Sequence, residues 1–184
     1  QHPAMIRGVR ELHAQKAPQT DFFLLSNSNE VYLSTILGCR GLRDVFTEVV
    51  TNPAQFEPSG LLRLRRRVPK DGPQHGCTVG CSANMCKGTY ALHTRTLTRQ
   101  DRLDAFLARH RERDYTRVVY VGDGANDFCP VQQLREQDVA FVRRHRGLAK
   151  RIHESGGVRC QVRYWTGAWE AEQLLQLLAV QQQI

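Results

Sequence analysis

Short apolar runs alternate with longer amphipathic segments along this chain. The apolar runs predict strands, at residues 22–25, 45–50, 118–121, 139–142 and 162–165. The amphipathic segments predict helices, at residues 5–15, 31–38, 97–111, 130–136, 148–154 and 169–180. Strands that alternate with helices are typical of a parallel sheet covered on both faces. We therefore expect an α/β fold with a doubly wound parallel sheet.

Two segments add detail to this pattern. Residues 57–80 are rich in glycine, proline and arginine, and they predict either a β-hairpin insertion around Ser59 and Gly60 or a loose loop. The last expected helix carries four leucines that we expect to face inward, namely Leu174, Leu175, Leu177 and Leu178.

The apolar run at 118–121 breaks at Gly122 and is followed by two carboxylates, Asp123 and Asp127. Asp123 lies at the carboxyl end of the expected strand, where open α/β sheets hold their active sites. A hard dication such as Mg²⁺ favours one or two carboxylates together with phosphate oxygens. The segment therefore predicts a metal-binding loop, although Asp-Gly and Asn-Asp pairs also form plain surface turns and helix caps.

A second strand end carries hydroxyl and amide groups. The run at 22–25 is followed by Ser26, Asn27, Ser28 and Asn29. A hydroxyl and backbone N–H groups at a strand end can hold phosphate oxygens, particularly where a helix starts just after them. Ser28 or Asn29 can equally serve as the N-cap of the helix that follows, and both interpretations can hold together.

Lys87 lies between these two strand ends, in the segment Asn84-Met85-Cys86-Lys87-Gly88, just before an amphipathic helix that begins near Tyr90. A lysine at a helix start can neutralise a bound phosphate. An isolated lysine is more often a solvated surface residue, so the position alone does not decide its role.

A serine after one strand, a lysine near a helix start and Gly-Asp-x-x-x-Asp after a later strand follow the motif order of the haloacid dehalogenase (HAD) superfamily. The chain resembles one family within it, the phosphoethanolamine/phosphocholine phosphatases and their pyridoxal-phosphate phosphatase relatives. Four segments carry this resemblance, which runs through most of the chain: Ser-Asn-Ser-Asn at 26–29, Thr-Asn-Pro-Ala at 51–54, Cys-Ser-Ala-Asn-Met-Cys-Lys at 81–87 and Gly-Asp-Gly-Ala-Asn-Asp-Phe-Cys-Pro at 122–130.

The resemblance implies a Mg²⁺-dependent phosphomonoester hydrolase that works through a phosphoaspartyl intermediate. It implies that Ser26 and Lys87 hold the phosphoryl group, with Asn27 and Gly124 also at the substrate. It further implies that Asp123 helps to bind Mg²⁺ and that Asp127 orients Lys87 or a metal-bound water.

The chain departs from the family at one decisive place. Members of the superfamily carry Asp-x-Asp after their first strand, in which the first carboxylate attacks phosphorus and the second acts as general acid and base. No aspartate of this chain is followed two residues later by aspartate or glutamate. We therefore expect residues 1–184 to be an HAD-like core without its first strand and most of its helical cap, inactive as it stands. A fragment and a shortened non-catalytic protein both explain this departure.

Length and composition agree with one globular unit. The chain has 184 residues, of which 41% are hydrophobic and 24% charged, and a chain of this length can bury a substantial core. No apolar run is long enough to span a bilayer, and no signal peptide is visible at this start. We expect a cytoplasmic protein without a membrane partner.

A formal net charge of +8 raises nucleic-acid binding as another function class. Two clusters contribute to it, Arg63 with Arg65, Arg66 and Arg67, and Arg143 with Arg144, His145 and Arg146. Neither has interleaved aromatic residues, so a solvated face is the preferred interpretation. The second cluster can also steer an anionic phosphate ester towards the site.

Six cysteines lie in a chain whose α/β pattern is typical of a reducing compartment, so we do not expect a disulfide framework. Four residues are clustered closely enough in sequence to supply ligands for a structural Zn²⁺, namely His75, Cys77, Cys81 and Cys86. The family that the chain resembles carries a similar cysteine-rich stretch with a tighter first spacing. We expect Cys129, next to Pro130, to be a buried small hydrophobe.

These observations favour a Mg²⁺-dependent phosphatase lineage that acts on a small phosphorylated metabolite. Phosphoethanolamine, phosphocholine and pyridoxal phosphate are not distinguished by the sequence. A non-catalytic phosphate-binding or interaction protein is the main alternative, and a basic nucleic-acid-binding module is the third.

Overall fold

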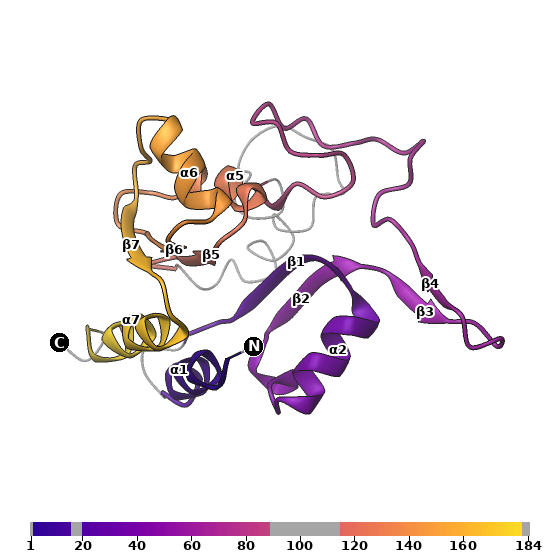
Figure 1. Ribbon diagram of the computed structural model, residues 1–184, viewed down its shortest axis with the longest axis horizontal. Coiled ribbons are helices and arrows are strands. Elements are labelled where there is room, and N and C mark those ends of the chain that lie inside the picture. Colours follow the sequence, from indigo (N-terminus) through magenta and orange to yellow (C-terminus); the bar gives the residue numbers. More distant parts are fainter. Residues whose placement is uncertain (1, 16–19, 89–114, 182–184) are drawn as a thin grey trace. The chain divides into compact units, whose positions relative to one another are not determined.

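The computed structural model describes residues 2–15, 20–88 and 115–181, which form two compact units (Figure 1). The first unit combines residues 1–72 with residues 167–184, and the second consists of residues 73–166. The helix expected at 97–111 and the helix start near Tyr90 lie outside the described residues.

The first unit contains two parallel strands and three α-helices. Its elements are α1 (Pro3–His13), β1 (Phe23–Asn29), α2 (Glu30–Cys39), the short 3₁₀ helix η1 (Arg43–Val45), β2 (Glu48–Asn52), β3 (Ala54–Phe56), β4 (Leu62–Leu64) and α7 (Ala168–Gln181). Strands β1 and β2 pair in parallel, with Phe23 opposite Glu48 and Leu25 opposite Val50. The core of this unit is formed by Ile6, Leu37, Leu42 and Val45.

Helices α1 and α7 lie side by side, although they come from opposite ends of the chain (Figure 1). Arg7 binds both carboxylate oxygens of Glu172, at 2.7 and 2.8 Å, and Gly8 lets Leu175 approach closely. Leu175 and Leu178 are buried as expected, but Leu177 is 51% exposed. The expectation of four inward leucines is therefore wrong for Leu177. Successive helical residues turn by about 100°, which places Leu177 outside the arc shared by the other three.

The segment 57–80 forms a hairpin at its start and irregular structure afterwards. Strands β3 and β4 pair antiparallel, and the turn between them places Gly60 at φ +83°, a backbone conformation that favours glycine. No helix or strand follows in residues 65–86.

The second unit is a three-stranded parallel sheet with short helices. Its elements are β5 (Val119–Gly122), the 3₁₀ helix η2 (Ala125–Asp127), α5 (Phe128–Gln133), β6 (Val139–Arg143), α6 (Gly147–Glu154) and β7 (Gln161–Trp165). The strand order is β5-β6-β7, with Val119 opposite Val139 and Val139 opposite Gln161. Its core is formed by Phe128, Val131, Leu134, Ala140, Val142, Leu148, Ile152 and Cys160.

The parallel strands and intervening helices confirm the expected α/β class. Among the described residues, these strands belong to two sheets, β1-β2 and β5-β6-β7, instead of one ladder. Strand β1 pairs only with β2 there, so no described strand continues that sheet beyond β1.

Several boundaries differ from the expected ones for local reasons. Helix α1 starts at Pro3 because proline suits the first helical turn and the ring nitrogen of His2 accepts a hydrogen bond from the Ala4 backbone N–H. Strand β1 continues to Asn29, whose side chain accepts from the Tyr32 N–H at 3.0 Å and caps α2. Residues 43–45 form η1, so the strand expected at 45–50 begins only at Glu48.

The helix expected at 130–136 also moves: α5 begins at Phe128 and ends at Gln133. Of the helices in the described ranges, none is long and apolar enough to cross a membrane.

Candidate active site

Asp127 is the central carboxylate of the second unit. It lies in η2, immediately after the loop that follows β5, and it is 4% exposed. Its Oδ1 accepts from Lys87 Nζ at 2.6 Å and from the Tyr120 hydroxyl at 2.8 Å. Its Oδ2 accepts from the backbone N–H groups of Asp123 at 3.0 Å and Gly124 at 2.9 Å. A carboxylate has about four lone-pair sites, so Asp127 is saturated by these donors.

Two glycines allow this loop to close around Asp127. A Cβ at Gly122 would lie 2.8 Å from the Asp127 Cγ, which is closer than carbon atoms can pack. A Cβ at Gly147, the first residue of α6, would lie 2.8 Å from the Ala125 backbone nitrogen. The next residue, Leu148, donates its N–H to the Asp123 carbonyl at 3.1 Å. The start of α6 thus packs against the loop that carries Asp123.

Lys87 is held by this carboxylate. Its side chain is 13% exposed, and it lies at the start of a helical turn with Gly88. An ammonium has three N–H donors, and Asp127 Oδ1 takes one of them. Lys87 can therefore donate its remaining N–H groups to a further acceptor such as a phosphate oxygen.

Asp123 differs from Asp127 in its surroundings. Its side chain is 54% exposed, and the nearest cation of the described chain is the Arg143 guanidinium, with 3.9 Å between Nη1 and Oδ2. Its position at the end of β5 and its accessible carboxylate oxygens suit a hard dication, which takes one or two carboxylates plus water and phosphate oxygens. Asp123 therefore fits Mg²⁺ as a single protein ligand, whereas the lone pairs of Asp127 are already used.

Tyr120 completes this network, and the sequence analysis did not single it out. Burial raises the pKa of its phenol well above the usual value, and the adjacent Asp127 carboxylate adds to this shift. The phenol is therefore held in its neutral form, which donates a hydrogen bond. The available signal was the alternation along a strand, which places residue 120 on the same face as Gly122, towards the loop.

The other expected site residues are placed as follows. Gly124 uses its backbone N–H for Asp127. In the first unit, Ser26 is half-buried in the middle of β1, and its Oγ accepts from the Ser28 N–H at 3.2 Å. Asn27 is exposed, and its carbonyl accepts from Asn52 Nδ2 at 2.9 Å. The structure thus brings Lys87, Asp123, Gly124 and Asp127 together, and the convergence of Ser26 and Asn27 with them stays a prediction.

Comparison with known proteins adds a family to this geometry. A sequence family described as Putative Phosphatase matches residues 1–179. The chain belongs to this phosphatase family. The expected membership of the HAD-type phosphoethanolamine/phosphocholine and pyridoxal-phosphate phosphatase group is thereby confirmed.

Three relatives of the phosphatase family illustrate the match. Pyridoxal phosphate phosphatase PHOSPHO2 of Mus musculus is 34% identical over 86% of this chain and 61% of its own length. A thiamine phosphate phosphatase-like protein of Arabidopsis thaliana is 30% identical over 91% of this chain and 64% of its own. Probable phosphatase phospho1 of Danio rerio is 40% identical over 76% of this chain and 46% of its own. The chain thus spans roughly half to two thirds of these relatives, and no solved structure matches it.

The cysteine cluster of this phosphatase-family chain differs from the zinc ligands expected from the sequence, because Cys129 takes the place of His75. The sulfurs of Cys77, Cys81, Cys86 and Cys129 lie within 4.8 Å of one another. His75, expected as a ligand, instead has its Nε2 2.8 Å from the Ser82 carbonyl oxygen. Cys129 is buried as expected, but it contacts other thiols and does not merely fill apolar space. The sequence missed it because it is separated from the other three by more than forty residues.

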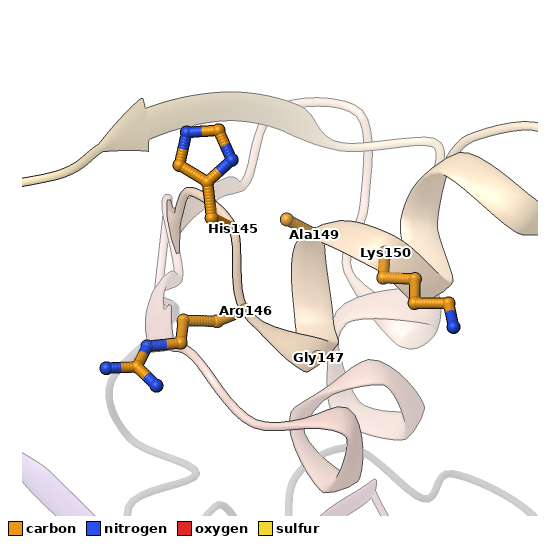
Figure 2. Close-up of a pocket in the computed structure, with 5 residues that line it drawn as sticks. All are labelled: His145, Arg146, Gly147, Ala149 and Lys150. Atoms are coloured by element: carbon orange, nitrogen blue, oxygen red, sulfur yellow. The ribbon is translucent and has the colours of Figure 1, made fainter.

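The second basic cluster lies at the turn from β6 into α6. His145, Arg146, Gly147, Ala149 and Lys150 line a surface pocket of about 590 Å³. Figure 2 shows the His145 ring, the Arg146 guanidinium and the Lys150 ammonium pointing in different directions, so they do not converge on one anion. Arg143 and Arg144 stack on Trp165 and Tyr164, at 5.2 and 4.9 Å from the ring centres. This cluster therefore supplies a positive surface beside the Asp123 loop.

Proposed function

We propose that this chain carries the phosphate- and metal-binding part of a Mg²⁺-dependent phosphomonoester hydrolase. The observation that supports it most is the largely buried ion pair of Lys87 and Asp127 beside the exposed carboxylate of Asp123. A largely buried lysine needs a fixed counter-charge, and Asp127 supplies it while leaving N–H donors of the ammonium for a second anion.

Lys87 would hold an oxygen of the phosphoryl group, and Asp123 would bind Mg²⁺. When bound, Mg²⁺ would neutralise negative charge on the phosphate. Asp127 would act as a positioning residue, because its four hydrogen bonds fix the Lys87 ammonium and the backbone of the Asp123 loop. Ser26 Oγ, with the backbone near Asn27, would hold the remaining phosphate oxygens.

The covalent step requires a carboxylate nucleophile that the 184 residues do not contain as Asp-x-Asp. Groups that stabilise charge can bind a phosphate without cleaving its ester. We therefore expect this chain alone to bind phosphate in a Mg²⁺-dependent manner and to hydrolyse esters hardly or not at all.

The substrate class that we propose is a small phosphomonoester. Two relatives are named for pyridoxal phosphate and thiamine phosphate, both of which carry the phosphate on a small organic alcohol. The positive surface at the start of α6 would attract such an anion towards the Asp123 loop.

Calorimetric titration of inorganic phosphate into the 184-residue chain, with and without Mg²⁺, tests this proposal. Phosphate should bind more tightly with Mg²⁺, and Asp123→Asn should remove the Mg²⁺ effect without disturbing the fold, since Asp123 is exposed. Asp44→Asn is the matched control, because Asp44 is an exposed aspartate of η1 in the other unit. It should leave binding unchanged.

Turnover of pyridoxal phosphate, phosphoethanolamine and phosphocholine by the same samples gives a second readout. Mg²⁺-independent phosphate binding that Asp123→Asn leaves intact would contradict the metal assignment. Rapid Mg²⁺-dependent hydrolysis by this chain would contradict the need for Asp-x-Asp.

A further inference from the structure

Four thiols meet at one point in the second unit. Cys77, Cys81 and Cys86 come from the irregular segment before Lys87, and Cys129 comes from α5. The Cys129 sulfur lies 3.5 Å from that of Cys77 and 3.4 Å from that of Cys86. All six cysteines of the chain lie in described residues, and none of them forms a disulfide.

The separations between these sulfurs fit a single tetrahedral ion. With Zn–S bonds of about 2.3 Å, two sulfurs of a tetrahedral site lie about 3.8 Å apart. The two contacts of the Cys129 sulfur, at 3.5 and 3.4 Å, are just below this value, and all four sulfurs lie within 4.8 Å of one another. A disulfide requires about 2.05 Å between sulfurs. A polynuclear iron–sulfur cluster distributes its thiolates over several irons, which separates them further.

The surroundings of the sulfurs can stabilise thiolates. The Val79 backbone N–H donates to the Cys77 sulfur at 3.4 Å, and Gln133 Nε2 lies 3.9 Å from the Cys129 sulfur. A Zn²⁺ ion with four thiolates carries a net charge of −2, and N–H groups directed at the sulfurs disperse such a charge. Arg151 adds a cation nearby, because it donates to the Val79 carbonyl at 2.8 Å and stacks over Phe128 at 4.8 Å.

The same cluster is joined directly to the candidate active site. Cys86 precedes Lys87, and Cys129 follows Asp127 by two residues. No larger residue fits at position 88, because a Cβ on Gly88 would overlap the Cys129 sulfur. An ion on these sulfurs would therefore fasten the irregular segment to α5. Its ligands Cys86 and Cys129 are close in sequence to the two members of the Lys87–Asp127 pair.

We propose that Cys77, Cys81, Cys86 and Cys129 bind one structural Zn²⁺ that fastens the segment before Lys87 to α5. Binding replaces the four thiol protons by Zn–S bonds, so four protons are released and no oxidant or reductant is needed. Four protein ligands close the coordination sphere, which is typical of structural zinc. The zinc assignment stands independently of the proposed phosphatase function.

Elemental analysis of the purified 184-residue chain tests the site. One zinc per chain is expected in the wild-type chain and in Cys39→Ser, the matched control, since Cys39 is an exposed cysteine at the end of α2. Cys81→Ser should lose the zinc, whereas Cys81→His should retain it by supplying a nitrogen ligand. Replacement by Co²⁺ should give the intense visible bands of a tetrahedral thiolate site in the wild-type chain and in Cys39→Ser, and these bands should be missing in Cys81→Ser.

A thermal melt covers the case in which Cys81→Ser misfolds. A zinc chelator should lower the Tm of the wild-type chain and of Cys39→Ser, and added Zn²⁺ should restore it. A wild-type chain that takes up no zinc on refolding, that contains iron instead, or that joins these cysteines in disulfides under reducing conditions would overturn the proposal. Full zinc occupancy in folded Cys81→Ser would do so as well.

Discussion

Asp127 illustrates how a buried carboxylate is stabilised in this fold. Its desolvation is offset by an ammonium, a phenol and two backbone N–H groups, so each lone pair has a donor. The removal of one partner leaves the others in place but leaves part of a buried charge without compensation. The two side-chain donors should therefore differ in their contribution to the free energy of unfolding.

Lys87→Ala should destabilise the chain by about 3 kcal/mol, because it removes the only cation bonded to the buried Asp127 carboxylate among the described contacts. Urea denaturation measures the change. Lys150→Ala is the matched control, since the Lys150–Glu154 pair is exposed and 3.7 Å long, and its loss should cost less than about 0.5 kcal/mol. Equal effects of the two substitutions would show that Lys87 is not held as described.

Tyr120→Phe should cost about 1 kcal/mol, the usual contribution of one hydrogen bond. The raised pKa of Tyr120 also predicts a pH dependence. Its contribution to stability is fully present below the unfolded pKa of about 10 and is lost as pH rises towards the native pKa. Alkaline denaturation followed by phenolate absorbance should show this loss in the wild-type chain. Tyr164→Phe, a half-exposed tyrosine, should keep it, and a Tyr120→Phe chain with the same alkaline profile would contradict the shift.

Asp138 predicts the opposite pH dependence. Burial tends to raise its pKa, but bonds from the Arg135 side chain and from the N–H groups of Arg135 and Val118 outweigh burial and lower it. Its contribution to stability is therefore present above the unfolded pKa of about 4 and is lost as pH falls through the lowered native pKa. Asp138→Asn should lower the free energy of unfolding by about 2 kcal/mol at neutral pH. Urea denaturation at a series of pH values should show that the substituted chain loses less stability on acidification than the wild-type chain. Asp71→Asn, at an exposed aspartate, should change neither the free energy of unfolding at neutral pH nor its loss on acidification. The same loss on acidification in Asp138→Asn as in the wild-type chain would refute the assignment.

At this scale, the sequence predicted the residues whose chemistry is visible in a short segment. Asp123, Asp127 and Lys87 follow strand ends or precede a helix, and such positions can be read along the chain. Cys129 gains its role from thiols more than forty residues away, and a cysteine beside proline carries no local signal of such contacts. Strand alternation places Tyr120 on the same face as Gly122, but it does not identify Asp127 as the partner of its hydroxyl.

At the scale of elements, close backbone approach decides where the helices can sit. The first residue of α6 lies against the η2 backbone, and this contact positions the loop that carries Asp123. Any side chain there must push two backbone segments apart. Glycine at position 147 is therefore a packing requirement as well as a feature of the turn.

Gly147→Ala should destabilise the second unit by roughly 1–3 kcal/mol, because its Cβ would lie 2.8 Å from the Ala125 nitrogen. Gly76→Ala is the matched control: a Cβ at that position meets nothing within 4 Å, so its effect should be neutral or slightly stabilising. Urea denaturation compares the two. A neutral Gly147→Ala would show that α6 and η2 are less tightly packed than described.

Apolar periodicity predicted the order and type of most elements, but it did not predict the residues at which they begin and end. The position of β1, β5, β6, β7 and α6 was predicted to within a few residues. The extension of β1 to Asn29 depends on a side-chain cap, and the late start of β2 depends on η1. The exposure of Leu177 depends on what α7 packs against, which a leucine pattern does not specify.

At the scale of the whole molecule, the predicted site takes its residues from both compact units. Lys87, Asp123 and Asp127 belong to the second unit, and Ser26 and Asn27 belong to the first. Family membership and motif order predict that these groups act on one phosphate. Local spacing along the chain cannot predict whether these groups converge, because they lie far apart in the sequence.

A crystal structure of the 184-residue chain with Mg²⁺ and inorganic phosphate tests this central claim most directly. We predict one phosphate that contacts both the Lys87 ammonium and the Ser26 hydroxyl, with Mg²⁺ bound to the Asp123 carboxylate and to a phosphate oxygen. The Lys87–Asp127 pair should remain intact in that complex. A phosphate bound away from Lys87, or Mg²⁺ bound without Asp123, would contradict the account.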